Sequence, residues 1–257
     1  MTSALIGFTG FVGGSVASQR SFDEYYRSTN IEDMAGRSYE LVVCCGAPGV
    51  KWLANKEPEK DLAAIRRLMS ALGQIRSRVV VLVSTVDVYP LPRGVDELTP
   101  IDPETVAPYG KHRLLLERFV AERFERFHVM RLPGLFGPGL KKNAIYDLLN
   151  DHQTEKIDHR AVFQFYSTER LWADIERVVD AGLPLVNWST EPVSVAEMAL
   201  KSFAIDFRQE TDAAPARYDM RTAHAARFGQ SGSYIYSRDE VLTDLRRYVA
   251  RARGGRP

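Results

Sequence analysis

The sequence predicts an α/β protein with a doubly wound parallel sheet, and two observations carry this prediction. Short apolar runs alternate with stretches of helical periodicity over the first half of the chain, as in successive β–α–β units. The clearest of these runs, Leu41–Ala47 and Arg78–Thr85, are continuously apolar over most of their length. Continuous runs are typical of parallel strands that helices cover on both faces.

A glycine-rich turn follows the first apolar run, Ala4–Ile6, and precedes a helix that begins near Ser15. A turn of this kind places backbone N–H groups and the positive end of a helix dipole at one point, where phosphate binds well. One glycine permits the tight turn, another lets a pyrophosphate approach, and a third lets helix and strand pack closely. We therefore expect a Rossmann-type core whose dinucleotide contacts include Gly7, Thr9, Gly10, Phe11, Val12 and Gly13.

The remaining elements of this core follow in chain order. A short polar run suits an outer strand, and Pro108 suits the first turn of a long helix. Segments rich in Pro, Gly, Asp and Thr indicate loops. We expect strands over Phe22–Arg27 and Phe127–Leu132, helices over Pro58–Leu72 and Pro108–Arg126, and loops over residues 87–107 and 133–140.

The alternation becomes irregular from about Gly139. The sequence therefore predicts a dinucleotide-binding core over residues 1–138, with later segments returning to the sheet. Residues 139–257 are expected to form mostly a small substrate-binding lobe and a C-terminal helix. Its elements are expected at Asn143–Asp151, Glu169–Ala181, Val193–Phe203 and Ser237–Arg251 (helices), and at Arg160–Tyr166 and Leu183–Asn187 (strands).

The composition excludes several classes of partner. The 257 residues include 34 basic and 33 acidic side chains, a balance that gives no reason to expect binding to nucleic acid or to an anionic membrane. No apolar run approaches the roughly 18 residues of a membrane span, and no basic region precedes the first one. The adjacent Cys44 and Cys45 indicate reduced thiols and a cytoplasmic protein, and the scattered histidines predict no metal site.

Ligands of such sheets bind beyond the carboxyl ends of the strands. Gly46 and Ala47 end one predicted strand and Ser84 ends another, so we expect them beside the cofactor. Arg27 and Ser28 end the second strand, where an acidic residue favours NAD and an arginine favours NADP. Arg27 thus favours NADP weakly, with a solvated loop arginine as the alternative and NAD still open.

Several motifs occur in one order along the chain. They are Thr9-Gly10-Phe11-Val12-Gly13-Gly14, Ser84-Thr85-Val86-Asp87-Val88-Tyr89, Tyr109 to Arg113, Arg131-Leu132-Pro133 through Gly137-Pro138-Gly139, and Asp219-Met220-Arg221-Thr222 with Phe228-Gly229. Together they resemble the extended short-chain dehydrogenases of the NAD-dependent epimerase/dehydratase family. The compact predicted lobe is similar to that of dTDP-4-dehydrorhamnose reductases.

The resemblance implies hydride transfer between a nicotinamide cofactor and a nucleotide sugar, in an enzyme that is typically a homodimer. Thr85 would hold the substrate oxygen, Tyr109 would be the acid/base, and Pro133 would contact the cofactor. A phenol with a pKa near 10 needs a nearby positive charge to act as a base at neutral pH. In the family, a lysine four residues after the tyrosine supplies this charge and binds the nicotinamide ribose.

This chain has Arg113 at that position, and Lys111 would lie on another side of the helix. Arg113 either keeps the activating role with altered geometry or marks a site that binds nucleotide without turnover. The alternatives are therefore a non-catalytic NAD(P)-binding regulator or scaffold, and a ketoreductase of a non-sugar substrate.

Substrate contacts are less specific. Asp87, two residues past Thr85, is a candidate for an extra acid or base. Lys141, Lys142 and Asn143 would meet a substrate pyrophosphate or form a solvated basic turn. Gly134 departs from the asparagine that sugar-nucleotide enzymes of the family often have, and Trp52 with Lys51 lines the pocket or belongs to the core.

Overall fold

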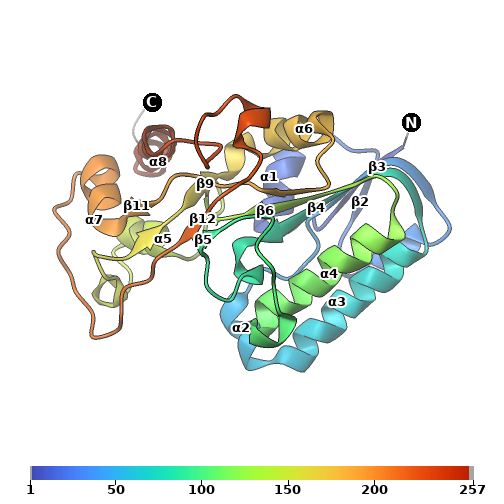
Figure 1. The fold of residues 1–257 in the computed structure, drawn as a ribbon, viewed down its shortest axis with the longest axis horizontal. Coiled ribbons are helices and arrows are strands. Elements are labelled where there is room, and N and C mark those ends of the chain that lie inside the picture. Colours follow the sequence, from blue (N-terminus) through green and yellow to red (C-terminus); the bar gives the residue numbers. More distant parts are fainter. Residues whose placement is uncertain (1, 255–257) are drawn as a thin grey trace. The chain divides into compact units, whose positions relative to one another are not determined.

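The computed structural model describes residues 2–254, which form two compact units (Figure 1). The first unit contains residues 2–91, 97–132 and 169–187, and the second contains residues 92–96, 133–168 and 188–254. The second unit thus takes in residues 133–138 and the short segment 92–96, whereas the predicted division lies at residue 138.

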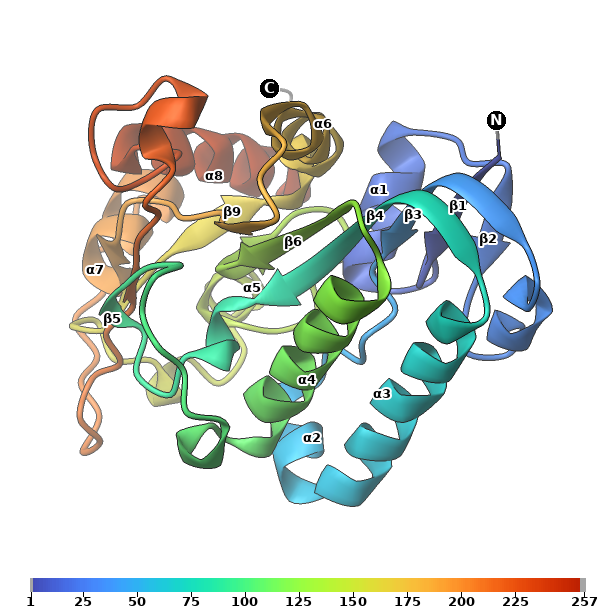
Figure 2. The ribbon, with the colours of Figure 1, turned by 45° about the vertical axis from the view of Figure 1, so that its right-hand side comes forward.

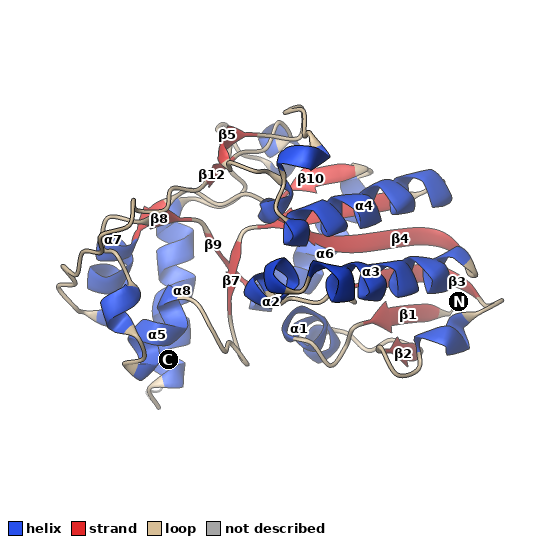
Figure 3. Cartoon of the chain, turned by 90° about the horizontal axis from the view of Figure 1, so that it is seen from below, coloured by secondary structure: helices blue, strands red, loops and turns tan. Residues whose placement is uncertain are grey.

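The first unit is built on a six-stranded sheet in which all neighbouring strands are parallel (Figure 3). The strand order is β10-β6-β4-β3-β1-β2. The order reverses between β1 and β3, and such a reversal opens a crevice at the carboxyl ends of the strands. This topology confirms the predicted doubly wound fold. Its strands are β1 (Ser3–Ile6), β2 (Glu24–Tyr26), β3 (Ser38–Cys44), β4 (Arg76–Thr85), β6 (Phe127–Leu132) and β10 (Leu185–Asn187).

Helices cover both faces of this sheet. Figures 1 and 2 show α3 (Pro58–Gly73) and α4 (Pro108–Arg123) side by side on one face, and α1 (Phe11–Gln19) and α6 (Leu171–Ala181) on the other. Because both faces are covered, the central strands bury continuous apolar runs. The core includes Ala4, Ile6, Val42, Val80, Leu82, Ile65, Leu68, Leu72, Leu116 and Val120.

One helix of the first unit, α2 (Lys51–Lys56), has no counterpart in the predicted elements. Its six residues bury only Ala54, while Trp52 is 63% exposed and Leu53 is 38% exposed. A segment this short carries no apolar stripe that periodicity could detect. The exposure of Trp52 also excludes the alternative that it belongs to the core.

The long predicted loop before α4 contains short ordered elements. They are the 3-10 turns η2 (Val86–Val88) and η3 (Pro103–Thr105) in the first unit, and β5 (Arg93–Val95) in the second. Helix α4 ends at Arg123, three residues before its predicted end, because Phe124 adopts an extended conformation. The first unit also contains the turn η1 (Ile31–Met34).

The second unit contains paired short strands and three helices. Strand β5 pairs with β12 (Asp219–Met220), β7 (Gly134–Phe136) with β9 (Phe165–Ser167), and β8 (Val162–Phe163) with β11 (Val193–Ser194). The predicted strand Arg160–Tyr166 is thus two strands, split at Gln164, whose side chain binds the carbonyls of Thr190 and Met220. The helices are α5 (Ala144–Asn150), α7 (Val195–Met198) and α8 (Arg238–Ala252).

Further short turns complete the described chain. They are η4 (Thr154–Lys156), η5 (Thr168–Arg170), the π-helical turn η6 (Ala199–Phe203) and η7 (Ala225–Phe228). Within residues 2–254, no helix combines the length and the apolar character that crossing a bilayer requires.

Candidate functional site

The glycine-rich turn joins β1 to α1, and two of its glycines are required by the protein's own packing. Gly7 has a φ of +85°, and a Cβ there would overlap the carbonyl group of Cys45 at the end of β3. A Cβ on Gly13 would overlap the carbonyl oxygen of Gly7. These two glycines therefore let β1, β3 and α1 approach one another, as the sequence predicts.

Gly10, the N-cap of α1, is a different case. Its φ of −82° is open to any residue, and a Cβ there would meet only the Gly7 carbonyl oxygen, at 3.3 Å. No side chain of the described residues caps the first turn of this helix. The backbone conformation does not require a glycine here, and the one close contact of a Cβ is milder than the overlaps at Gly7 and Gly13. The missing side chain leaves space in front of backbone N–H groups at a helix N-terminus, a place that is suited to bind phosphate.

The other residues predicted near a cofactor lie around this turn or after neighbouring strands. Thr9, Phe11 and Val12 belong to the turn and the first turn of α1. Gly46 and Ala47 follow β3, where a Cβ on Gly46 would lie 2.8 Å from the Ile6 side chain. Arg27 and Ser28 are exposed directly after β2. Pro133 is buried and belongs to the second unit.

Ser84 and Thr85 end β4, beside the end of β6. The Thr85 hydroxyl oxygen is half-buried and accepts a hydrogen bond from the backbone N–H of Asp87 at 3.2 Å. The Ser84 hydroxyl instead donates to the buried carboxylate of Glu117 in α4. Thr85 can thus still donate its proton to a ligand, whereas any cofactor contact of Ser84 would come from its backbone.

A buried polar network, which sequence reasoning missed, fixes the strand ends on this side of the sheet. Arg131 of β6 forms a salt bridge with Glu117 at 2.6 Å and donates to the Tyr89 hydroxyl at 2.7 Å. Asn187 of β10 donates to the same hydroxyl at 2.9 Å. Burial raises the pKa of Tyr89. The network joins β6, β10 and α4 and leaves Tyr89 as a structural phenol rather than an acid/base.

Tyr109 lies in the first turn of α4, and its backbone N–H donates to the side-chain oxygen of Asn55 in α2 at 2.9 Å. Burial raises the pKa of Tyr109 above the ordinary value of 10.0; the positive charges of Arg113 and Lys51 oppose this rise, and Asp87 and Asp61 add to it. The phenol therefore keeps its proton at neutral pH.

Arg113 is fixed against the face of the Tyr109 ring. Its guanidinium carbon lies 3.9 Å from the ring centroid, within cation–π range. Its two terminal nitrogens donate to Asp61 at 2.5 and 2.9 Å, to the Tyr109 carbonyl at 3.0 Å and to the Pro48 carbonyl. The Nε atom is buried without a partner among the described residues. Arg113 thus acts on the ring through its charge and offers no exposed N–H.

Asp61 is the buried partner that holds this arrangement. Burial opposes its ionisation, but the hydrogen bonds from Arg113 and His112 outweigh burial and hold the pKa of Asp61 below its usual value of 3.8. His112 Nδ1 lies 2.7 Å from the carboxylate. The sequence contains no local signal for Asp61, which lies in α3, 52 positions before Arg113.

Asp87 and Lys51 form a salt bridge at 2.7 Å beside Tyr109. A Cβ on Gly110 would overlap the carbonyl oxygen of Asp87, so the glycine after Tyr109 lets η2 approach the start of α4. The structure therefore brings Asp87, Lys51 and Tyr109 together. In the sequence, the glycine at position 110 is the one local sign that the Asp87 backbone lies against the start of α4.

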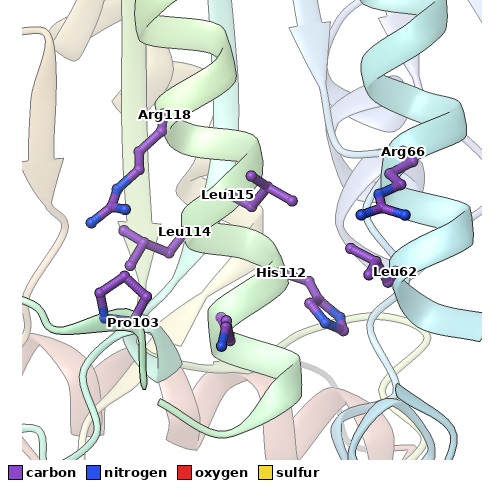
Figure 4. A pocket seen from close by; sticks show the side chains of 8 residues that line it. Leu62, Arg66, Pro103, His112, Leu114, Leu115 and Arg118 are labelled. Carbon is purple, nitrogen blue, oxygen red and sulfur yellow. The ribbon is translucent and has the colours of Figure 1, made fainter. Parts of the chain in front are cut away.

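Lys111 does not reach this cluster. Its ammonium binds Glu104 at 2.8 Å, and its side chain lines a groove between α3 and α4. The groove encloses about 250 Å³, and Figure 4 labels most of the residues that line it. They are Leu62, Arg66, Pro103, Lys111, His112, Leu114, Leu115 and Arg118. It includes neither Thr85 nor Tyr109, so it is separate from the predicted catalytic residues.

The remaining substrate candidates belong to the second unit. Lys141 and Lys142 are exposed. Asn143 is the N-cap of α5: its side-chain oxygen accepts from two backbone N–H groups at 3.0 and 3.1 Å, and its amide donates to the Leu135 carbonyl at 2.9 Å. At Gly134, a Cβ would lie 2.9 Å from the Gln164 carbonyl oxygen, which explains the glycine at this position.

A protein-family model described as the NAD dependent epimerase/dehydratase family matches residues 24–192, a range that starts after the glycine-rich turn. No curated protein sequence matches the chain significantly.

Solved structures of similar fold cover almost the whole chain. A dTDP-4-dehydrorhamnose reductase from Clostridium acetobutylicum is 16% identical, with a TM-score of 0.74 over 98% of this chain and 100% of that one. A UDP-N-acetylglucosamine 4-epimerase from Methanobrevibacter ruminantium is 14% identical, with a TM-score of 0.73 over 96% of each chain. The reductase from Bacillus anthracis, in complex with NADP, is 16% identical, with a TM-score of 0.72 over 97% of this chain and 98% of that one. At these identities the likeness is one of fold.

The family match spans about two thirds of the sequence, and the parallel sheet agrees with it. The chain therefore belongs to the NAD dependent epimerase/dehydratase family.

Proposed function

We propose that this protein is an NAD(P)-dependent oxidoreductase that reduces a keto group of a nucleotide sugar. The observation that carries the proposal is the open space at Gly10, at the start of α1, where the strand order reverses. The pyrophosphate of the cofactor would lie there, against the N–H groups of Phe11 and Val12, because the Gly10 N–H already donates to the Gly7 carbonyl at 2.9 Å. The nicotinamide ring supplies the hydride.

Thr85 and Tyr109 would handle the substrate oxygen. The Thr85 hydroxyl, whose oxygen already accepts from the Asp87 N–H, is free to donate its proton to that oxygen. Tyr109 would donate its phenolic proton as the hydride reaches the carbon. Because burial raises the pKa of Tyr109, the proton is in place at neutral pH, which favours reduction of a carbonyl over oxidation of an alcohol.

Arg113 would serve this chemistry by charge and by position. Its guanidinium lies against the ring and stabilises negative charge on the phenol as the proton leaves. Its hydrogen bonds to Asp61 and to the Tyr109 carbonyl hold the ring in place. In the family, the usual lysine also donates a hydrogen bond to the nicotinamide ribose. In this chain another residue would have to make that contact.

The cofactor preference rests on the residues after β2. Arg27 is exposed at the position where a basic side chain pairs with a 2′-phosphate, and the chain has no acidic residue directly after this strand. This favours NADP over NAD, and the Bacillus anthracis reductase of the same fold binds NADP.

A nucleotide sugar is favoured as substrate because enzymes of similar fold are named for nucleotide sugars, such as the dTDP-4-dehydrorhamnose reductase and the UDP-N-acetylglucosamine 4-epimerase. The exposed Lys141 and Lys142 are suited to its diphosphate, and Asp87 is suited to a second proton transfer. A cytoplasmic homodimer is the proposed working form.

A second candidate is a regulator that binds NAD(P) without turnover. It is favoured because the terminal N–H groups of Arg113 already donate to Asp61 and to backbone carbonyls, so they cannot bind the cofactor ribose as the usual lysine does. The fluorescence of NADPH and NADH, measured with and without a panel of 4-keto nucleotide sugars, separates the candidates. Saturable binding followed by oxidation with one member supports the reductase. Binding without oxidation across the panel supports the regulator, and oxidation only by simple ketones supports a non-sugar ketoreductase.

A further inference from the structure

Four charged side chains from four elements lie near enough to Tyr109 to influence its pKa. Arg113 lies on α4, Asp61 on α3, Lys51 on α2, and Asp87 on η2. They form two ion pairs, Arg113 with Asp61 and Lys51 with Asp87. Two cations, each with its own carboxylate, thus act on the phenol through their charges, and the two pairs differ in how deeply they are buried.

The first pair is locked. The side chains of Arg113 and Asp61 are 3% and 4% exposed, and two parallel hydrogen bonds join them. His112 binds the same carboxylate, and two backbone carbonyls take the other guanidinium hydrogens. Moving the guanidinium would leave a buried carboxylate without its cation, which is strongly unfavourable. Arg113 therefore cannot turn toward a new negative charge.

The second pair is open. Lys51 and Asp87 have side chains that are 46% and 19% exposed, and an ion pair of 2.7 Å joins them. Ion pairs as exposed as this one contribute little to stability, so the Lys51 ammonium is held less tightly to its carboxylate than the Arg113 guanidinium is to Asp61. A lysine side chain also carries its charge on a flexible stem with rotatable donors.

The backbone holds this open pair at the start of α4. Asn55 lies one turn after Lys51 on the same side of α2 and accepts the Tyr109 N–H at 2.9 Å. Asp87 is held from the other side, because Gly110 admits its carbonyl against the helix. Both ends of the Lys51–Asp87 pair are therefore anchored next to Tyr109 or Gly110.

We propose that Lys51, held by Asp87, is the ammonium that stabilises the ionised form of Tyr109, in the role of the lysine that usually follows the tyrosine by four residues. Arg113 then positions the ring and adds a fixed positive charge against its face. As the phenolic proton passes to the substrate oxygen, the Lys51 ammonium turns from the Asp87 carboxylate toward the phenolate. The inference rests on the proposed function only for the use of Tyr109 as acid/base.

The test is a pH titration of Tyr109 in the free protein, which needs neither cofactor nor substrate. Tyrosines labelled with ¹³C at the ζ carbon are followed by NMR, and Tyr109→Phe assigns the signal. Lys51→Met is expected to raise the pKa of Tyr109 and Asp87→Asn to lower it, while Lys51→Arg restores a value near that of the native protein. Lys56→Met, on the exposed end of the same helix, is the matched control and leaves the titration unchanged.

A titration that Lys51→Met does not move, or that Lys56→Met moves equally, would overturn the inference. Because Lys51 is exposed, its variants are expected to fold, which thermal unfolding checks. If the reductase activity is found, Lys51→Met lowers kcat about tenfold or more, with little change in KM, and Lys51→Arg recovers part of the loss. If no reductase activity is found but the titrations shift as expected, the proposed function fails while the link between Lys51 and Tyr109 stands.

Discussion

The guanidinium of Arg113 lies 3.9 Å from the centre of the Tyr109 ring while its hydrogens bind Asp61 and two backbone carbonyls. A residue in the place of a catalytic lysine is thus part of a buried ion pair. Arg113 can therefore hold the Tyr109 ring and place a fixed positive charge against it, but its terminal N–H groups are already bonded within the protein.

Arg113→Met is expected to destabilise the protein by about 3–5 kcal/mol, because the Asp61 carboxylate would stay buried without its bidentate partner. Urea unfolding measures the change. The double variant Asp61→Leu with Arg113→Met is the control, since removing both charges restores much of the lost stability. An Arg113→Met protein as stable as the native one would contradict the claim that the buried Asp61 carboxylate depends on Arg113.

Gly10→Val is expected to weaken NADPH binding at least tenfold and to lower stability less than a substitution at Gly13 does. The new side chain would fill the space before the first turn of α1, and its Cβ would lie 3.3 Å from the Gly7 carbonyl oxygen, a milder contact than the overlap at Gly13. Fluorescence titration of NADPH measures the affinity.

Gly13→Ala is the comparison variant, because it is expected to affect mainly the stability of the protein and not NADPH binding. Its Cβ would overlap the Gly7 carbonyl, so the protein should lose at least about 2 kcal/mol of stability. Equal stability of the two variants, or unchanged NADPH affinity in Gly10→Val, would speak against the assigned phosphate site.

The main strands and helices of the first unit could be predicted from the sequence, but the ion pairs near Tyr109 could not. Periodicity and continuous apolar runs locate β3, β4, α3 and α4 because burial of these elements follows from local pattern. Helix α2 escaped because a six-residue helix with an exposed Trp52 shows no such pattern.

Pairing between distant residues lies outside what a single sequence shows. Asp61 and Arg113 are 52 positions apart, and Lys51 and Asp87 are 36 apart. Only the fold reveals that these pairs flank Tyr109. Two glycines, Gly110 and Gly134, did carry a signal, because each marks a place where a backbone carbonyl approaches.

Tyr109→Phe is expected to lower turnover by about 10²–10⁴-fold, because the proton donor is lost, while NADPH binding stays within about twofold of the native value. Stopped-flow oxidation of bound NADPH measures the first quantity and fluorescence titration the second. Tyr89→Phe is the contrasting variant: it removes a buried hydroxyl of the structural network and should lower stability without affecting the proton transfer. Undiminished turnover of Tyr109→Phe would remove the phenol from the mechanism.

His128 makes stability depend on pH. It is buried in β6, its Nδ1 binds the Leu183 carbonyl at 2.7 Å, and burial lowers its pKa below 6.5. The unfolded chain therefore binds the proton more readily than the folded protein. The free energy of unfolding should fall as pH drops below about 6.5, by up to about 1.4 kcal/mol per pH unit, until the lowered pKa is reached.

Urea unfolding at several pH values measures this slope. His128→Asn, whose amide can replace the Nδ1–H donor, should lack the part of the slope that belongs to this residue. A native protein and variant with identical pH dependence would show that His128 is not the group responsible.

The transfer of deuterium from NADPH labelled at the reactive carbon of the nicotinamide tests the central proposal most directly. Incubated with a 4-keto nucleotide sugar, the native protein should place deuterium on the former carbonyl carbon, as mass spectrometry of the product would show. Tyr109→Phe should bind the labelled cofactor and transfer almost none. Tight binding of NADPH without any transfer across a panel of such sugars would contradict the assignment of a reductase.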